Sequence, residues 1–172
     1  MKQEEIPGRV SLRPVAAGDE EFLVKVYAST RADELARVPW TEAQRAAFVR
    51  MQFDAQQLHY QTHNPAATHD IILLDGLPVG RLYVARRRDE IRILDITILP
   101  EHRGGGTGTA LVRDLMTEAA RSGLPLNIYV ESYNRSRGLF ERLGFRKVDR
   151  PEDDGVNYLL EWESSRQEAG GS

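Results

Sequence analysis

The sequence predicts an α+β domain of the three-layer α/β kind, with a mixed central sheet of about six to seven strands. Apolar runs of strand length alternate with segments whose apolar residues recur every three or four positions, which is typical of helices packed on a sheet. Three strands between residues 71 and 99 follow one another through short turns, which favours an antiparallel meander. A strand at 93–99, a helix at 107–121 and a strand at 126–130 predict a parallel pair joined by a right-handed crossover.

Length and composition place the chain among ordinary globular proteins. Its 172 residues are 41% apolar and 28% charged, so we expect a single domain over 1–163 and a polar, flexible tail over 164–172. The net charge of −3 gives no general attraction for nucleic acid or an anionic membrane. The chain has no cysteine, which excludes thiolate chemistry. No signal-like segment or apolar run of ~18 residues occurs, so we expect a cytoplasmic protein.

The N-terminal part reads as one strand and two helices. A strand at 10–14 precedes a helix at 20–30, for which Asp19 is the expected N-cap. A second helix is expected to begin after Thr41, its N-cap, and to run to Leu58, because its apolar positions form one stripe.

A polar tract over 56–70 is expected to end this helix in a loop. His59 and His63 are four residues apart and His69 follows, which suggests a metal site. We favour solvated or substrate-loop histidines instead, since the tract offers no carboxylate pair at a fitting spacing and Asn64 and Pro65 interrupt the face.

The middle of the chain changes to strand periodicity. Strands at 71–74 and 79–85 flank Asp75-Gly76, a strong hairpin signal. A charged turn over 86–90 leads into the strand at 93–99. Beyond the crossover we expect the remaining elements to be a helix at 135–143 and strands at 145–148 and 157–162.

The strand at 93–99 is followed by a basic residue, Arg103, and by four glycines in the five positions 104–108. A helix begins directly afterwards. The first turn of a helix has N–H groups without partners, and glycine lets the backbone approach a phosphate closely. This segment therefore predicts a site for a phosphorylated ligand.

Two common phosphate loops do not fit. A P-loop requires lysine after its last glycine, but Thr109 follows Gly108, and the G-x-G-x-x-G fingerprint requires glycine where Thr109 or Leu111 stands. What remains is R-x-x-G-x-G from Arg103 to Gly108. In this respect the chain resembles the GNAT superfamily of N-acetyltransferases, whose acetyl-CoA pyrophosphate loop has the pattern [QR]-x-x-G-x-[GA].

A second segment strengthens the resemblance. Residues 133–145 read YNRSRGLFERLGF, where GNAT enzymes commonly show N-x-x-A-x-x-L-Y-E-x-x-G-F. Leu139, Glu141, Gly144 and Phe145 match. The resemblance covers nearly the whole chain, most weakly before residue 70, and it implies a fourth and fifth strand that splay apart, with helices on both faces of the sheet.

The resemblance implies acetyl-CoA as cosubstrate. Backbone groups at 97–99 would meet the pantetheine arm, the loop from Arg103 would hold the pyrophosphate, and Arg135 or Arg137 would meet the 3′-phosphate. The residues implied in cofactor binding are Thr97, Ile98, Leu99, Arg103, Gly104, Gly105, Gly106, Thr107, Gly108, Thr109, Asn134, Arg137 and Phe140.

Two departures affect the mechanism. The family tyrosine that protonates the departing thiolate is Phe140 here, and a phenyl ring has no O–H to donate. The family asparagine position falls on Tyr133, whereas the asparagine is one residue later, at Asn134. A water or the hydroxyl of Tyr133 or Tyr129 could replace the missing acid.

Two carboxylates are candidates for the general base. Asp95 lies within an apolar strand, where burial would raise its pKa towards that of a base. The alternative is a structural aspartate bonded to backbone or to Arg81. Glu131 follows the strand at 126–130. It is either a second candidate base or simply an exposed strand end. With Tyr133, these two residues form the predicted catalytic set, and no metal is expected.

Taken with the resemblance, the sequence predicts an N-acetyltransferase that moves an acetyl group from acetyl-CoA to a primary amine of a small molecule or peptide by direct attack. Alternatives are an acyl-CoA-binding sensor without catalysis, or a transferase that uses another acyl-CoA. We expect a monomer or homodimer with no nucleic-acid or membrane partner. Candidate wall residues on the acceptor side are Trp40, Phe53, Tyr60, Arg81 and Tyr83.

Overall fold

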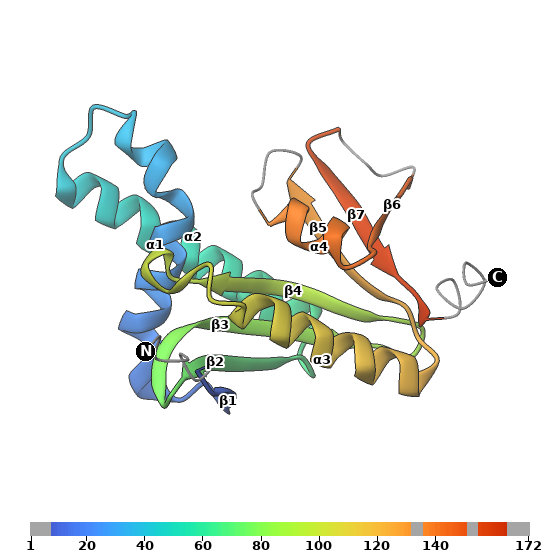
Figure 1. The fold of residues 1–172 in the computed structure, drawn as a ribbon. Coiled ribbons are helices and arrows are strands. Elements are labelled where there is room, and N and C mark those ends of the chain that lie inside the picture. The colour runs from blue at the N-terminus through green and yellow to red at the C-terminus, as the bar shows by residue number, and fades with distance from the viewer. Residues whose placement is uncertain (1–7, 132–135, 151–154, 165–172) are drawn as a thin grey trace, which may run out of the picture. The chain divides into compact units, whose positions relative to one another are not determined.

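The structure is a computed structural model that describes residues 8–131, 136–150 and 155–164. The chain forms two compact units (Figure 1). The first comprises Met1–Leu82 and Ile96–Thr107, and the second comprises Tyr83–Asp95 and Gly108–Ser172. Residues 165–172 of the predicted tail over 164–172 lie outside the described residues.

Strands and helices follow one another along the chain in the order that the sequence predicts. The strands are β1 (Val10–Pro14), β2 (Thr68–Leu74), β3 (Leu77–Arg86), β4 (Ile91–Ile98), β5 (Leu126–Glu131), β6 (Arg146–Val148) and β7 (Asn157–Trp162). The α-helices are α1 (Glu20–Ala36), α2 (Glu42–His63), α3 (Thr107–Ser122) and α4 (Arg137–Arg142), and short 3₁₀ helices are η1 (Ala17–Asp19) and η2 (Pro100–His102).

The strands form one mixed sheet in the order β1-β2-β3-β4-β5-β7-β6. β1 pairs antiparallel with β2, and β7 pairs antiparallel with both β5 and β6. β4 and β5 are parallel, and α3 connects them. The predicted mixed sheet and the predicted parallel pair are therefore confirmed.

In the first unit, α1 and α2 pack against each other, and their inner faces cover apolar residues of the sheet. Leu23 and Tyr27 of α1 meet Val49 and Phe53 of α2, together with Ile71 of β2. The rings of Tyr27 and Phe53 lie 6.1 Å apart. This apolar cluster is the burial that fixes both helices.

The predicted ends of both helices are wrong. α1 continues from residue 30 to Ala36, and α2 continues from Leu58 to His63, so residues 56–63 are helical and not a loop. Polar residues on the exposed side of a helix lack apolar periodicity, but the backbone hydrogen bonds continue regardless of them. The amide of Asn64 still donates to the carbonyl of Tyr60 at 2.8 Å.

The two predicted N-caps behave differently. Thr41 caps α2, because its hydroxyl accepts from the Gln44 amide at 3.2 Å while the Gln44 side chain accepts from the Thr41 amide. Asp19 occupies the N-cap position of α1 without capping it. Its carboxylate turns back to accept from the Arg13 guanidinium, at 2.8 Å, and from the Ala16 amide.

The hairpin turn is confirmed. Asp75 and Gly76 have φ values of 51° and 80°, as a two-residue turn between antiparallel strands requires. The Arg9 amide, directly before β1, donates to the Asp75 carboxylate at 2.9 Å and so stabilises the turn.

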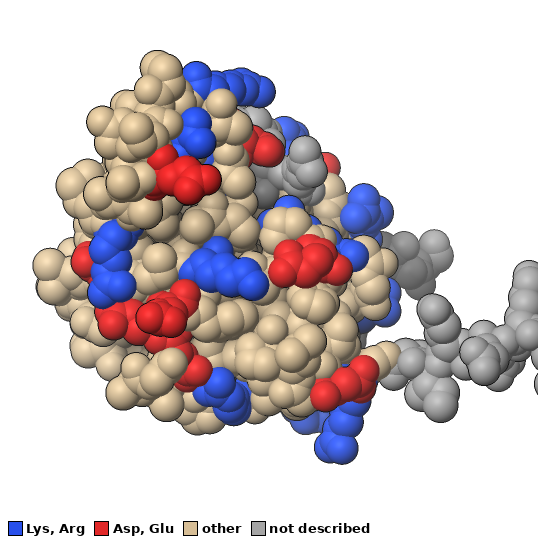
Figure 2. All heavy atoms as spheres, turned by 90° about the vertical axis from the view of Figure 1, so that its left-hand side faces the viewer, with Lys and Arg blue, Asp and Glu red and all other residues tan. Residues whose placement is uncertain are grey.

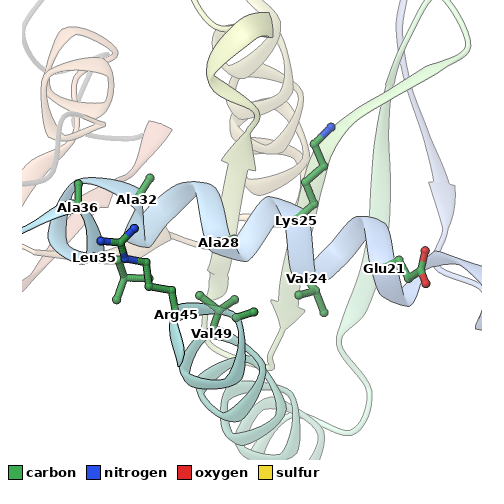
Figure 3. A pocket seen from close by; sticks show the side chains of 10 residues that line it. Glu21, Val24, Lys25, Ala28, Ala32, Leu35, Ala36, Arg45 and Val49 are labelled. Carbon is green, nitrogen blue, oxygen red and sulfur yellow. The ribbon is translucent and has the colours of Figure 1, made fainter. Parts of the chain in front are cut away.

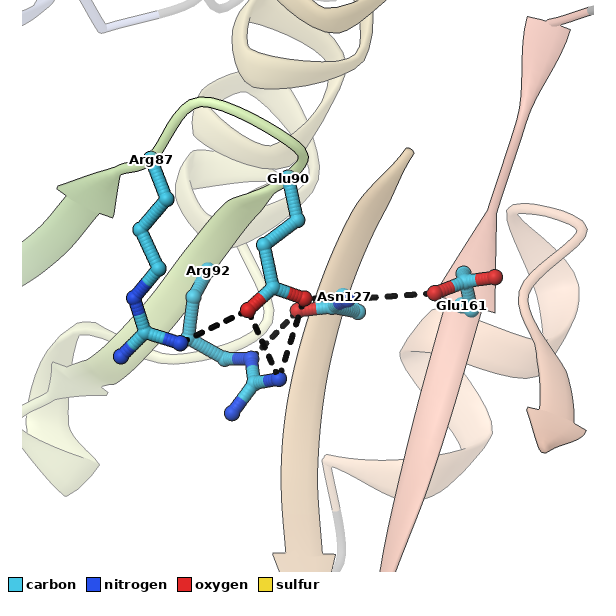
Figure 4. A network of polar contacts seen from close by, with 5 residues as sticks. All are labelled: Arg87, Glu90, Arg92, Asn127 and Glu161. Atoms are coloured by element: carbon cyan, nitrogen blue, oxygen red, sulfur yellow. Dashed lines mark hydrogen bonds and ion pairs between the residues drawn. The ribbon is translucent and has the colours of Figure 1, made fainter. Parts of the chain in front are cut away.

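In the second unit, a buried polar network joins the beginnings of β4 and β5 to β7 (Figure 4). Asn127, which is fully buried, donates to Glu90 at 2.7 Å and to Glu161 at 3.1 Å, and it accepts from Arg92. Arg87 also donates to Glu90, at 2.7 Å. Every polar group of Asn127 is thus bonded, which is the condition under which a buried amide stabilises a fold.

The same network determines the charge of Glu90. Burial alone would raise the pKa of this carboxyl, but the hydrogen bonds from Asn127 and Arg87 and the positive charges of Arg92 and Arg87 outweigh burial, so the pKa lies below its ordinary value. Glu90 is therefore held as a carboxylate.

Charges of both signs are mixed on the surface. On the face shown in Figure 2, Lys and Arg alternate with Asp and Glu, and neither sign forms a continuous patch. Among the described residues, no helix has the length and apolar character needed to cross a bilayer.

Candidate functional site

The end of β4 is fixed by a close approach of β3. A Cβ built on Gly80 would lie 2.1 Å from the carbonyl oxygen of Thr97 and 3.0 Å from the Cα of Ile98, so only glycine fits at this position. The amide of Leu99 then donates to the carbonyl of Val79 at 2.8 Å. The backbone of residues 97–99 is thereby held firmly in place directly before the glycine loop.

Arg103 is anchored to the same strand end. The chain turns through η2, and the Nε of Arg103 donates to the Ile98 carbonyl at 2.9 Å. The side chain is exposed, and no described carboxylate forms an ion pair with it. Its Nη groups are therefore available to an anion beside the loop.

The glycine loop has the backbone that an anion site requires. Gly104 and Gly106 have φ values of 85° and 83°, which favour glycine. None of the N–H groups of Gly104, Gly105 and Gly106 donates to a described carbonyl or side chain. A Cβ at any of the three would meet nothing within 4 Å, so these amides border open space.

The loop leads directly into α3, a helix of 16 residues that begins at Thr107. Thr107 is buried, and Gly108 and Thr109 belong to the first turn. The partial positive charge of a helix N-terminus adds to the amides of Gly104–Gly106 and to the guanidinium of Arg103. This arrangement fits a diphosphate.

The pairing between β4 and β5 is short. The register joins Ile91–Ile93 to Leu126–Ile128, and it ends there, although β4 continues to Ile98 and β5 to Glu131. Asp95 lies in the part of β4 beyond its register with β5, and Glu131 is the last residue of β5. Both are partly buried, and their assignment as general base remains a prediction.

Phe140 lies in the core of the second unit. Its ring is fully buried and packs edge-on against Phe145, with the ring centres 5.2 Å apart. Arg137, on the same helix, donates to Glu141 at 2.6 Å and lies over the ring of Tyr158. Contacts of Arg137 and Phe140 with a cofactor remain predictions. Tyr133, Asn134 and Arg135 lie outside the described residues.

The candidate wall residues differ in burial. Phe53, Arg81 and Tyr83 are buried, while Trp40 is exposed and Tyr60 partly so. Arg81 donates to the side chains of Gln56 and Gln57, so the helical part of the tract that was expected to be a loop supplies its partners.

The histidines of this tract lie at the end of α2. The rings of His59 and His63 are 4.3 Å apart, and His63 Nδ1 lies 2.9 Å from the His59 carbonyl. Among the described residues, no group of three histidine, cysteine or acidic side chains is placed to hold a metal ion.

Comparison with known families agrees with this geometry. The model of the acetyltransferase (GNAT) family matches residues 30–145. This match spans both the glycine loop and the segment that contains Phe140. The chain belongs to the GNAT acetyltransferase family. It is therefore an acyltransferase, and the resemblance inferred from the two motifs is confirmed. No curated protein sequence matches the chain significantly.

Solved structures of GNAT acetyltransferases share the fold. PaiA N-acetyltransferase from Thermoplasma acidophilum in complex with coenzyme A is 17% identical, with a TM-score of 0.67 over 90% of this chain and 99% of that one. An acetyltransferase from Thermus thermophilus is 21% identical, with a TM-score of 0.62 over 90% and 96%. A GNAT family acetyltransferase from Elizabethkingia anophelis with acetyl-CoA bound is 16% identical, with a TM-score of 0.56 over 90% and 97%.

Gly80 of this GNAT chain was not predicted from the sequence as a site residue. It stands within a strand of apolar residues, and an isolated glycine in such a strand often marks a close backbone approach. That signal was available, but the neighbour that comes close, Thr97, follows only from the pairing of the strands.

Proposed function

We propose that this chain transfers an acetyl group from acetyl-CoA to a primary amine of a small molecule or peptide. The observation that carries the proposal is the loop of Gly104, Gly105 and Gly106, whose free amides border open space beside Arg103. Family membership supports the acyl transfer. The bound coenzyme A and acetyl-CoA in two similar structures support the donor.

The donor is held by backbone more than by side chains. Amides of residues 104–108 and the guanidinium of Arg103 bind its diphosphate. The part of β4 beyond Ile93 has backbone groups that β5 does not pair. Backbone groups of residues 97–99 meet the pantetheine arm, apart from the Leu99 amide, which donates to Val79, and Gly80 keeps this segment in position.

The chemical step joins the acceptor nitrogen to the acetyl carbon and breaks the carbon–sulfur bond of the thioester. The amine must be neutral when it attacks, and it loses a proton, for which Asp95 and Glu131 are the candidate bases. A backbone N–H near Ile98 stabilises the negative charge that develops on the thioester oxygen. The departing thiolate takes up a proton.

Phe140 cannot supply that proton, because a phenyl ring has no donor. General acid help is typically worth ~10²–10⁴-fold in rate, whereas positioning of two reactants supplies ~7–11 kcal/mol of barrier reduction. A water, Tyr129 or Tyr133 takes the role of acid. The absence of a tyrosine at position 140 therefore reduces turnover without abolishing it.

One observation favours a second candidate function. Phe140 stands where the family has the tyrosine that protonates the thiolate, and the loss of this donor suits a protein that binds an acyl-CoA and responds to it without turning it over. A third possibility keeps the transfer but uses a longer acyl group from another acyl-CoA.

Release of free thiol from acetyl-CoA across a panel of primary amines tests the proposal. The panel should include amino acids, polyamines and short peptides with a free N-terminus. We expect thiol release that depends on at least one amine. Tight acetyl-CoA binding with no release across the panel would favour the sensor, and release only from longer acyl-CoA would favour the third candidate.

A pair of glycine variants makes the assay specific for the loop. Gly105→Val adds a side chain where the structure has open space and no positive φ, and Gly18→Val does the same in η1. We expect the KM for acetyl-CoA to rise at least ~10-fold in Gly105→Val, since one charge-assisted hydrogen bond is worth about that factor. Gly18→Val should leave it unchanged.

A further inference from the structure

A cavity of about 480 Å³ lies between α1 and α2, within the first unit (Figure 3). Its walls are largely apolar and include Val24, Ala28 and Ala32 of α1 and Val49 of α2. The small alanine side chains leave the space open. Its volume falls in the range of ~300–1,000 Å³ that is usual for small-molecule sites, which are mostly apolar with a few polar groups that orient the ligand.

Arg45 of α2 is the charged group that reaches into this cavity. In Figure 3 its guanidinium extends from α2 toward Leu35 and Ala32 of α1. One nitrogen, Nη2, donates to the Val38 carbonyl at 3.0 Å. The Nε is buried and has no hydrogen-bond partner among the described residues. A buried N–H without a partner costs ~1–3 kcal/mol.

The charge of Arg45 is also uncompensated. No described carboxylate forms an ion pair with it. Arg45 is the fourth residue of α2, where the helix dipole disfavours a positive charge. An arginine in this position gains from an anion on two grounds, because the anion accepts from Nη1, for which no acceptor is described, and offsets the unfavourable interaction with the dipole.

The other charges that line the cavity do not supply that anion. Glu21 and Lys25 stand four residues apart on α1, and both line the cavity. Lys25 reaches away to Glu101, with its Nζ 4.0 Å from the carboxylate. Glu21 lies far along α1 from Leu35 and Arg45 in Figure 3, and no ion pair is described between Glu21 and Arg45, so Glu21 does not supply an anion at the Arg45 end of the cavity.

We propose that this cavity binds a monocarboxylate with an apolar chain. The carboxylate accepts hydrogen bonds from the Arg45 guanidinium, and the chain lies along the alanine and valine walls. The ligand chemistry follows from the Arg45 guanidinium at one end of a largely apolar space. None of the residues that line the cavity belongs to the glycine loop, and occupation of the cavity does not depend on acetyl transfer.

Isothermal titration of the full chain with octanoate tests the proposal in the absence of acetyl-CoA. We expect saturable binding with one molecule per chain. Arg45→Met keeps the length of the side chain and removes its charge, and it should weaken binding at least ~10-fold, as for loss of a charge-assisted hydrogen bond. Arg50→Met is the matched control, because Arg50 lies on the same helix, pairs with Glu20 and Asp54, and does not line the cavity.

A second variant tests the location independently of Arg45. Ala32→Leu fills the cavity with a good helix former, and it should also weaken octanoate binding while circular dichroism remains that of the unmodified protein. Octylamine, which carries the opposite charge, should bind more weakly than octanoate. The proposal is wrong if octanoate binding does not saturate, if octylamine binds equally well, or if Arg45→Met and Ala32→Leu bind octanoate as the unmodified chain does.

If Arg45→Met does not fold, NMR methyl signals of the unmodified chain, recorded with and without octanoate, test the location of binding. Octanoate is expected to shift the Ala28, Ala32 and Val49 methyl signals. Shifts confined to methyl groups outside the cavity would overturn the proposal.

Discussion

Gly104 and Gly106 hold backbone angles that other residues avoid, whereas Gly105 between them does not. Glycine is therefore required at the three positions for different reasons. A left-handed conformation costs a non-glycine residue roughly 1–2 kcal/mol, so the outer glycines are required by the turn itself. Gly105 is required by neither backbone angle nor packing, and a close ligand is the remaining reason for a glycine there.

Asp19 provides a prediction about pH at the same scale. The hydrogen bonds from the Arg13 side chain and the Ala16 amide lower the pKa of Asp19 to about 2, below its ordinary value of ~3.9. A lowered carboxyl pKa stabilises the fold above pH ~4, and this contribution is lost as the pH falls toward 2. We expect the difference in unfolding free energy between the unmodified chain and Asp19→Asn to shrink over that interval.

Urea titrations at several pH values between 6 and 2 measure this difference. Arg13→Gln removes the partner of the same carboxylate and should reduce the pH dependence similarly. A difference between the unmodified chain and Asp19→Asn that stays constant across the range would contradict the assignment.

At the scale of elements, the start of the β4–β5 pair depends on Asn127. This amide lies at the register position opposite Arg92 of β4 and opposite Glu161 of β7, so one side chain joins three strands. Parallel pairing over only three residues is a weak connection by itself. The network of Figure 4 therefore contributes much of what holds β4 to β5.

Asn127→Ala tests this role. The substitution leaves polar atoms of Glu90, Arg92 and Glu161 with fewer partners in a partly buried place, and each unsatisfied group costs ~1–3 kcal/mol. We expect a loss of about 3 kcal/mol in the free energy of unfolding, measured by urea denaturation with an unchanged slope. Gln61→Ala, at an exposed amide on α2, is the control and should change stability by less than ~0.5 kcal/mol. Equal effects of the two substitutions would rule out the structural role of the network.

Some elements could be predicted from local sequence and others could not. The Asp75-Gly76 turn and the Thr41 cap follow from the chemistry of two to four adjacent residues, and both were predicted correctly. The last turns of α1 and α2 follow from hydrogen bonds and tertiary partners, such as Gln56 and Gln57 beside Arg81. Because hydrophobic periodicity contains no signal for such polar partners, the predicted helices ended too early.

At the scale of the whole molecule, the order of helices and strands along the chain and the parallel pair could be predicted, because the connection lengths and the crossover rule leave few arrangements. The glycine loop could be located because its pattern lies in one continuous segment. The α1–α2 cavity could not, since helical periodicity does not show where the side chains of two packed helices leave a gap. The close approach of Gly80 to Thr97 likewise depends on strand register.

The central claim is that the amides from Gly104 to Gly108 hold the diphosphate of the acyl donor. A crystal structure of the chain with coenzyme A measures this directly. We predict that diphosphate oxygens lie within ~2.7–3.2 Å of these amide nitrogens, with Arg103 beside them. A diphosphate bound elsewhere on the chain, or no bound coenzyme at millimolar concentration, would contradict the account.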